Sequence, residues 1–199
     1  MSAVLSYPLR AWIGLAQRWR DANQRRHCAT RAGTRILPGG CIVNQQDARD
    51  AISLGANSWI AGQLLVYAHA GRIEIGDFCY VGENTKIWSA QHVAIGNRVF
   101  LAHGVNVHDN DAHSLSAQTR HAHFRELVTR GQASFVEDFS SAPIRIEDDV
   151  WVGFNSTILK GTHIGRGAII GACALVTRDV EAFTIVAGNP AVVVGQAKP

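Results

Sequence analysis

The chain has 199 residues and a net charge of +3, because 19 lysines and arginines stand against 16 acidic residues. This length is enough for one domain with a sizeable core, and the near balance of charge does not indicate a nucleic-acid partner for the chain as a whole. No apolar run reaches the roughly 20 residues that span a bilayer. The N-terminus also lacks the apolar region and cleavage site that are typical of a signal peptide.

The cysteines indicate neither disulfide bonds nor a metal site. The four cysteines form no CxxC pair and have no metal-ligand spacing: Cys28, Cys41, Cys79 and Cys173. We therefore expect reduced thiols in a cytoplasmic protein.

Residues 1–50 differ in kind from the rest and are expected to form an N-terminal helical and transition segment. One face of the expected helix is apolar and arginines occupy its other positions; the apolar residues are Leu9, Trp12, Ala16 and Trp19. Two interpretations stay open. The helix packs against the rest of the chain or a neighbouring subunit, or it makes a peripheral contact with an anionic membrane surface, at the inner face of the membrane.

Aliphatic residues then recur at every sixth position. The longest run is Ile146, Val152, Ile158, Ile164, Ile170 and Val176, and shorter runs begin at Leu54, Ile75 and Ile95. A period of six fits neither an α-helix nor alternating strands. It is typical of a parallel β-helix, in which each repeat is one strand with its corner and three repeats close a triangular coil. We predict an all-β fold with a β-helix over residues 51–182 and a C-terminal tail at 183–199.

The six-residue pattern stops after Val107 and resumes at Ile144, which predicts an inserted loop over residues 108–143. Uninterrupted loops of this length are usually functional or disordered. This one carries His113, with Asp109 and Asp111 just before it, and it is long enough to reach a neighbouring subunit.

Four motifs in order make the chain resemble the hexapeptide-repeat O-acetyltransferases. They are the looped-out His113, Asp-Val-Trp-Val-Gly at 149–153, Ile-Gly-x-Gly-x-Ile-Ile-Gly-Ala at 164–172 running into Val-Thr-Arg-Asp at 176–179, and Ala-Gly-Asn-Pro-Ala at 187–191. The similarity covers about residues 52–195. It is to the glycan-pathway members of a group that also includes the maltose, galactoside and xenobiotic acetyltransferases.

That resemblance implies a left-handed helix, acetyl-CoA as the co-substrate, no required metal, and a homotrimer with active sites between subunits. It assigns the catalytic base to His113 and an aromatic contact near the acceptor and cofactor to Trp151. Gly153 and Ala172 would line the pantetheine groove.

The nucleotide end of coenzyme A would meet Thr177 and Arg178, where the family has a Thr-Lys pair. The arginine keeps the charge and improves the geometry toward phosphate. At the position of the acceptor-binding asparagine of galactoside-type members this chain has Gly82, so the acceptor contacts do not transfer.

The chemistry expected of these residues is direct transfer of an acetyl group to a sugar hydroxyl of a surface glycan, of the capsule or lipopolysaccharide kind, or of its precursor. A neutral imidazole at His113 suits removal of the hydroxyl proton near pH 7. Asp109 and Asp111 are the candidates for orienting that imidazole. Backbone N–H groups of the coil are the expected donors to the oxyanion.

Three alternatives remain. One is N-acetylation of an amino sugar nucleotide by the same base, and another is a scaffold without catalysis. The third is a zinc lyase of the γ-carbonic-anhydrase type, for which His103, His108 and His69 would supply the metal ligands.

Overall fold

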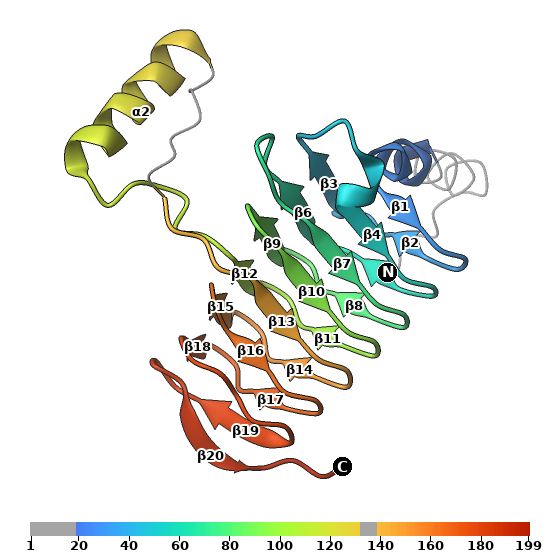
Figure 1. The fold of residues 1–199 in the computed structure, drawn as a ribbon. Helices are drawn as coiled ribbons and strands as arrows, with labels where there is room; N and C mark the ends of the chain where they lie inside the picture. Colours follow the sequence, from blue (N-terminus) through green and yellow to red (C-terminus); the bar gives the residue numbers. More distant parts are fainter. Residues whose placement is uncertain (1–18, 132–138) are drawn as a thin grey trace, which may run out of the picture.

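The chain folds as a left-handed parallel β-helix of three sheets, in a computed structural model that describes residues 19–131 and 139–199 (Figure 1). Sheet A has the order β1 (Ala29–Thr30), β4 (Ile52–Leu54), β7 (Ile73–Ile75), β10 (Val93–Ile95), β13 (Ile144–Ile146) and β16 (His163–Ile164). Sheet B has the order β2 (Arg35–Ile36), β5 (Trp59–Ile60), β8 (Tyr80–Val81), β11 (Phe100–Leu101), β14 (Trp151–Val152), β17 (Ile169–Ile170), β19 (Thr184–Ala187) and β20 (Val192–Gln196). Sheet C runs from β3 (Cys41–Asn44) through β6 (Gln63–Val66), β9 (Lys86–Ser89), β12 (Asn106–His108) and β15 (Thr157–Leu159) to β18 (Leu175–Val176). The predicted fold class is confirmed.

The six-residue pattern becomes the core. Ile60, Val81, Leu101, Val152 and Ile170 pair in register down sheet B, and each is at most 1% exposed. Because every strand contributes one inward aliphatic at the same height of the coil, the interior is a continuous apolar column with no need for a second layer.

The glycines that follow these aliphatics are required for close approach rather than for an unusual backbone. A Cβ on Gly76 would lie 2.4 Å from the carbonyl oxygen of Gly96, and one on Gly96 would lie 2.7 Å from the backbone nitrogen of Asp148. Both contacts are with the next coil, whose position is fixed by the strand ladder. The left-handed corner residues are elsewhere and include asparagines such as Asn57 (φ 57°) and Asn155 (φ 55°).

The first coil begins earlier than the sequence pattern indicated. Strands β1, β2 and β3 pair in parallel with β4, β5 and β6, so the helix starts near Ala29 rather than at residue 51. In this coil the residues that pair with Leu54 and Val66 are Thr30 and Asn44, so polar residues interrupt the aliphatic pattern there. The 3-10 helices η1 (Arg25–His27) and η2 (Arg49–Ala51) flank this coil.

Residues 19–24, which are helical, lie against the open end of the first coil. The Asp21 carboxylate accepts a hydrogen bond from the backbone N–H of Ile36 at 3.0 Å, and the Gln24 side chain accepts one from Ile42 at 2.5 Å. These residues therefore pack on the β-helix, as the first interpretation of the N-terminal segment expected. Leu9, Trp12 and Ala16 lie outside the described residues, and Trp19 is 70% exposed.

The insertion between β12 and β13 contains α2 (Ala117–Arg130), which projects from the side of the prism (Figure 1). The Ser116 hydroxyl accepts a hydrogen bond from the backbone N–H of Thr119 in the first turn of α2, and Gly131 ends the helix in the left-handed conformation (φ 74°). No α2 residue is buried.

The segment at 183–199, expected to be a C-terminal tail, contains two strands of sheet B. β19 continues sheet B in parallel, and β20 turns back to pair with it in antiparallel fashion. No helix in the described part of the chain is both long and apolar enough to cross a membrane.

Candidate active site

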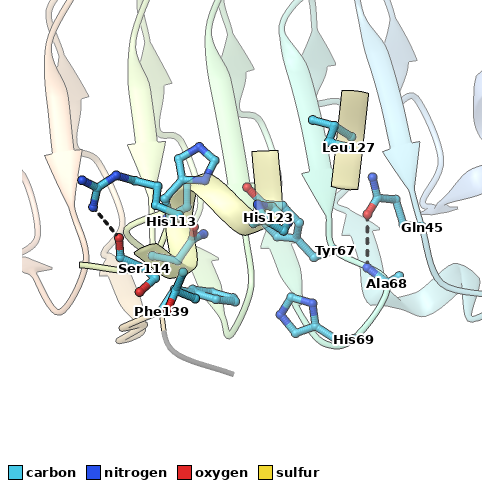
Figure 2. Close-up of a pocket in the computed structure, with 13 residues that line it drawn as sticks. Gln45, Tyr67, Ala68, His69, His113, Ser114, His123, Leu127 and Phe139 are labelled. Carbon is cyan, nitrogen blue, oxygen red and sulfur yellow. Dashed lines mark hydrogen bonds between the residues drawn. The ribbon is translucent and has the colours of Figure 1, made fainter. Parts of the chain in front are cut away.

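A pocket of about 370 Å³ lies between the insertion and the corner that follows sheet C (Figure 2). The loops after β3 and β6 form one wall, with Gln45, Tyr67 and His69. The insertion forms the other, with His113 before α2 and Arg120 and His123 on it. This is the size of a small-molecule site.

The regular coil explains why residues so far apart in sequence share this pocket. Val66 of β6 pairs with Ser89 of β9, and β9 pairs in turn with β12, so the residues after each strand emerge at the same corner. Tyr67 and His69 stack with ring centroids 5.8 Å apart, and Phe139, at the return of the insertion, packs edge-on against His69 at 5.3 Å. The insertion is thus in contact with a coil two turns before its own root.

His113, the expected base, is exposed on this pocket and its ring lies 5.9 Å from that of His123, at an angle of 61°. Within the described residues no carboxylate lies within hydrogen-bonding distance of the His113 ring. An exposed imidazole at the mouth of a pocket can meet a substrate hydroxyl directly.

Asp109 has a different part from the orienting one that we expected. Its side chain is fully buried and is surrounded by four donors: the hydroxyl of Ser89 (2.6 Å), the backbone amides of Ala90 (2.7 Å) and Gln91 (2.9 Å), and the side-chain amide of Asn110 (2.9 Å). A carboxylate so occupied fixes the root of the insertion to the preceding coil. Burial raises the pKa of Tyr67, and the charge of Asp109 raises it further.

Asp111 also points elsewhere, because its carboxylate forms an ion pair with the ammonium group of Lys160. Lys160 follows β15, one coil beyond the insertion. The two aspartates before His113 therefore hold the two sides of the insertion's root, and neither contacts the imidazole.

The residues expected to bind the cofactor lie apart from this pocket. Trp151 is in β14 of sheet B, half-exposed, in register with Phe100. Gly153 and Ala172 do meet, since a Cβ on Gly153 would lie 2.6 Å from the Ala172 nitrogen. Thr177 and Arg178 follow β18 at the far end of sheet C. None of these five lines the His113 pocket.

Four residues that line the pocket had no expected role in acyl transfer: Tyr67, His69, Arg120 and His123. The stacking of strands that the six-residue pattern implies would place Tyr67 and His69 at the corner from which the insertion leaves. Nothing in the sequence places α2 over that corner.

The three histidines considered for zinc do not converge. His103 stacks on Phe154 with centroids 5.2 Å apart, and His108 stacks on Trp88 at 5.0 Å, with its pKa lowered mainly by burial. In residues 19–131 and 139–199 no group of three metal-ligating side chains comes together.

Comparisons with known proteins agree with the repeat and the fold. Residues 143–178 match the bacterial transferase hexapeptide (six repeats) family. Over 65 residues the chain is 52% identical to 2,3,4,5-tetrahydropyridine-2,6-dicarboxylate N-acetyltransferase of Staphylococcus aureus (strain bovine RF122 / ET3-1). That alignment covers 33% of this chain and 27% of the relative, so the chain spans about a quarter of the length of the curated relatives it matches.

Two solved structures show the same architecture at low identity. One is AntD, an N-acyltransferase from Bacillus cereus in complex with dTDP and 3-hydroxybutyryl-CoA, with a TM-score of 0.65 and 14% identity over 90% of this chain and 88% of that one. The other is a hexapeptide-repeat acetyltransferase from Vibrio cholerae O1 biovar eltor complexed with acetyl-CoA, with a TM-score of 0.52 and 23% identity over 100% and 92% of the two chains.

Proposed function

We propose that this chain, which carries the transferase hexapeptide repeat on a left-handed β-helix, transfers an acetyl group from acetyl-CoA to a sugar with His113 as general base. The observation that carries the proposal is the exposure of His113 on the pocket. His113 belongs to the insertion, whose first residues are held against the preceding coil by the buried Asp109. The expected acceptor is a hydroxyl of a surface glycan or its precursor.

The proposed step is a direct transfer. The acceptor oxygen attacks the thioester carbonyl carbon while His113 takes its proton. The tetrahedral intermediate then expels the coenzyme A sulfur as the C–S bond breaks, and the imidazolium returns the proton to that sulfur.

A second acceptor chemistry, acetylation of an amino group on a sugar nucleotide, is favoured by two of the similar proteins. The Staphylococcus relative and AntD are both N-acyltransferases, and AntD was solved with dTDP. The two chemistries are separable by the product, because mild alkali cleaves an O-acetyl ester and leaves an N-acetyl amide intact.

The primary test is His113→Ala. A lost general base lowers turnover by about 10²–10⁴, while the affinity for acetyl-CoA, measured by calorimetry, should stay the same. His121→Ala is the matched control, because His121 is exposed on α2 and does not line the pocket. Equal activity of the two variants would remove His113 as the base.

The coenzyme site is proposed to include Trp151, Gly153, Ala172, Thr177 and Arg178, which come from a neighbouring subunit of a homotrimer. Their separation from the His113 pocket within one chain supports this arrangement. Arg178→Ala should weaken acetyl-CoA binding, and Arg125→Ala should not.

A mixing experiment tests the shared site. If each site takes His113 from one subunit and Trp151 from the next, mixed oligomers of His113→Ala and Trp151→Ala chains contain some intact sites. Co-expression should then restore part of the activity that each variant lacks alone. No restoration, in oligomers shown to be mixed by mass, would place the whole site in one chain.

A further inference from the structure

Apart from a tyrosine, the ionisable side chains that line the His113 pocket are all ones that can carry positive charge and not negative charge. Arg120, His69, His113 and His123 line it, and among the described residues no aspartate or glutamate does. The carboxylates closest in sequence to His113 interact with other groups. Asp109 accepts hydrogen bonds from its four donors, and Asp111 forms an ion pair with Lys160. On α2, Glu126 pairs with Arg130.

Arg120 is the most informative member of this set. Its Nη1 donates to the backbone carbonyl of Ser114 at 2.8 Å and to that of Leu115 at 3.3 Å, the two residues after His113. It forms no ion pair within the described residues, and its remaining N–H donors have no partner there. A guanidinium anchored by backbone carbonyls, without a carboxylate, is preorganised for an anionic ligand.

His123 lies one turn along α2 from Arg120 and on the same wall of the pocket. Its ring nitrogens likewise have no hydrogen-bond partner among the described residues, and its ring makes an edge contact with that of His113. Arg120 and His123 together offer donors to one anionic group beside the expected base.

We infer that Arg120 and His123 bind a phosphate group of the acceptor, so that the substrate class is a phosphate-bearing sugar rather than a neutral one. A pocket of about 370 Å³ holds the sugar and its adjoining phosphate, and whatever the phosphate carries extends outward. This inference rests on the proposed function in identifying the bound ligand as the acyl acceptor, but binding of an anion at this site can be measured without any acyl transfer.

The test is calorimetric titration of the full chain, without acetyl-CoA, with glucose, glucose 1-phosphate, UDP and inorganic phosphate. We expect both phosphorylated organic ligands to bind and glucose not to bind. Arg120→Gln should weaken their binding about tenfold or more, since a charge-assisted hydrogen bond is lost, and His123→Asn should weaken it less. Arg125→Gln, on the same helix but outside the pocket, should bind as the unchanged chain does.

Tighter binding of UDP than of glucose 1-phosphate would assign the phosphate to a nucleotide, and equal binding would assign recognition to the phosphate itself. Equal binding of glucose and glucose 1-phosphate, or full affinity in Arg120→Gln, would overturn the inference. Phosphate binding through Arg120 in a protein that transfers no acetyl group would refute the proposed function alone. Acetylation of free sugars with the same kcat/KM as their phosphates would refute the inference alone.

Discussion

Ser89 and Asp109 join two successive coils at the base of the insertion, with the serine hydroxyl 2.6 Å from a carboxylate that has no solvent exposure. Two backbone amides, of Ala90 and Gln91, point at the same carboxylate. The loop that carries His113 is therefore fixed at its first residue, and its geometry depends on a buried charge that touches no substrate.

Asp109→Ala should reduce both stability and activity. Removing the carboxylate leaves several buried donors without a partner, each worth about 1–3 kcal/mol, and we expect the free energy of unfolding in urea to fall by about 2–4 kcal/mol. Asp111→Asn is the control, because its ion pair with Lys160 is partly exposed and such pairs contribute about 1 kcal/mol or less. Similar losses in the two variants would contradict the structural role given to Asp109.

Gly153→Ala should destabilise the helix independently of any ligand. The added Cβ would lie 2.6 Å from the backbone nitrogen of Ala172 and 2.9 Å from the carbonyl oxygen of Ile170, and neither backbone atom can move without breaking the ladder. We expect a loss of about 1–3 kcal/mol, as for other overpacked sites, measured by thermal or urea unfolding. At Gly195 a Cβ would meet only Ile185 side-chain atoms at 3.7 Å and beyond, so Gly195→Ala should be close to neutral. A neutral Gly153→Ala would leave pantetheine binding as the better reason for this glycine.

Acid should destabilise the protein through the carboxylates at the corner after sheet A. Hydrogen bonds, first from Arg98 and then from Arg166, hold the pKa of Asp149 below its ordinary value of 3.8, and a hydrogen bond from His163 holds the pKa of Glu147 below 4.5. A pKa lowered in the folded state means stability that is present above the ordinary pKa and lost as the pH falls through the folded one. The free energy of unfolding should therefore decline as the pH falls from about 4.5 to below 3.8.

Asp149→Asn tests this assignment. The variant should be less stable near neutral pH and should show a shallower decline in acid, because one of the titrating groups is gone. Asp47→Asn, at an exposed position without an ion pair in the described chain, should keep the original slope. If both variants follow the same pH curve, the acid sensitivity comes from other groups.

Most of the fold could be predicted because the residues of the six-residue pattern are the ones that form the core. The repeat positions from Leu54 to Val107 and from Ile146 to Val176 are all buried. The first coil was missed because polar residues, Thr30 and Asn44, stand at the positions that pair with Leu54 and Val66 of the next coil. The need for glycine at Gly76 and Gly96 could not be predicted either, because it comes from contact between coils that only the three-dimensional structure shows.

The candidate site could be predicted less well. The position of His113 follows from where the pattern breaks. The partners of Asp109 are two backbone amides, the Ser89 hydroxyl and the Asn110 side-chain amide, and no sequence motif indicates this arrangement. Arg120 and Tyr67 share a pocket only because α2 lies over a corner two coils away from the insertion's root.

The N-terminal end of the β-helix offers a final prediction. β2 and β3 are the terminal strands of their sheets, so their outer backbone N–H groups have no neighbouring strand. Asp21 and Gln24 accept hydrogen bonds from two of these N–H groups, those of Ile36 and Ile42, and so cap the first coil of the repeat array.

Asp21→Ala should lower the free energy of unfolding by about 1–2 kcal/mol. It should also speed hydrogen exchange at the Ile36 amide, with little change at Ile170 in the interior of sheet B. Asn23→Ala, on the same helical segment but without a side-chain hydrogen bond in the described chain, should leave exchange at Ile36 as it was. Unchanged protection of Ile36 in Asp21→Ala would mean that the segment does not stay on the β-helix in solution, and the membrane-surface interpretation would then regain its weight.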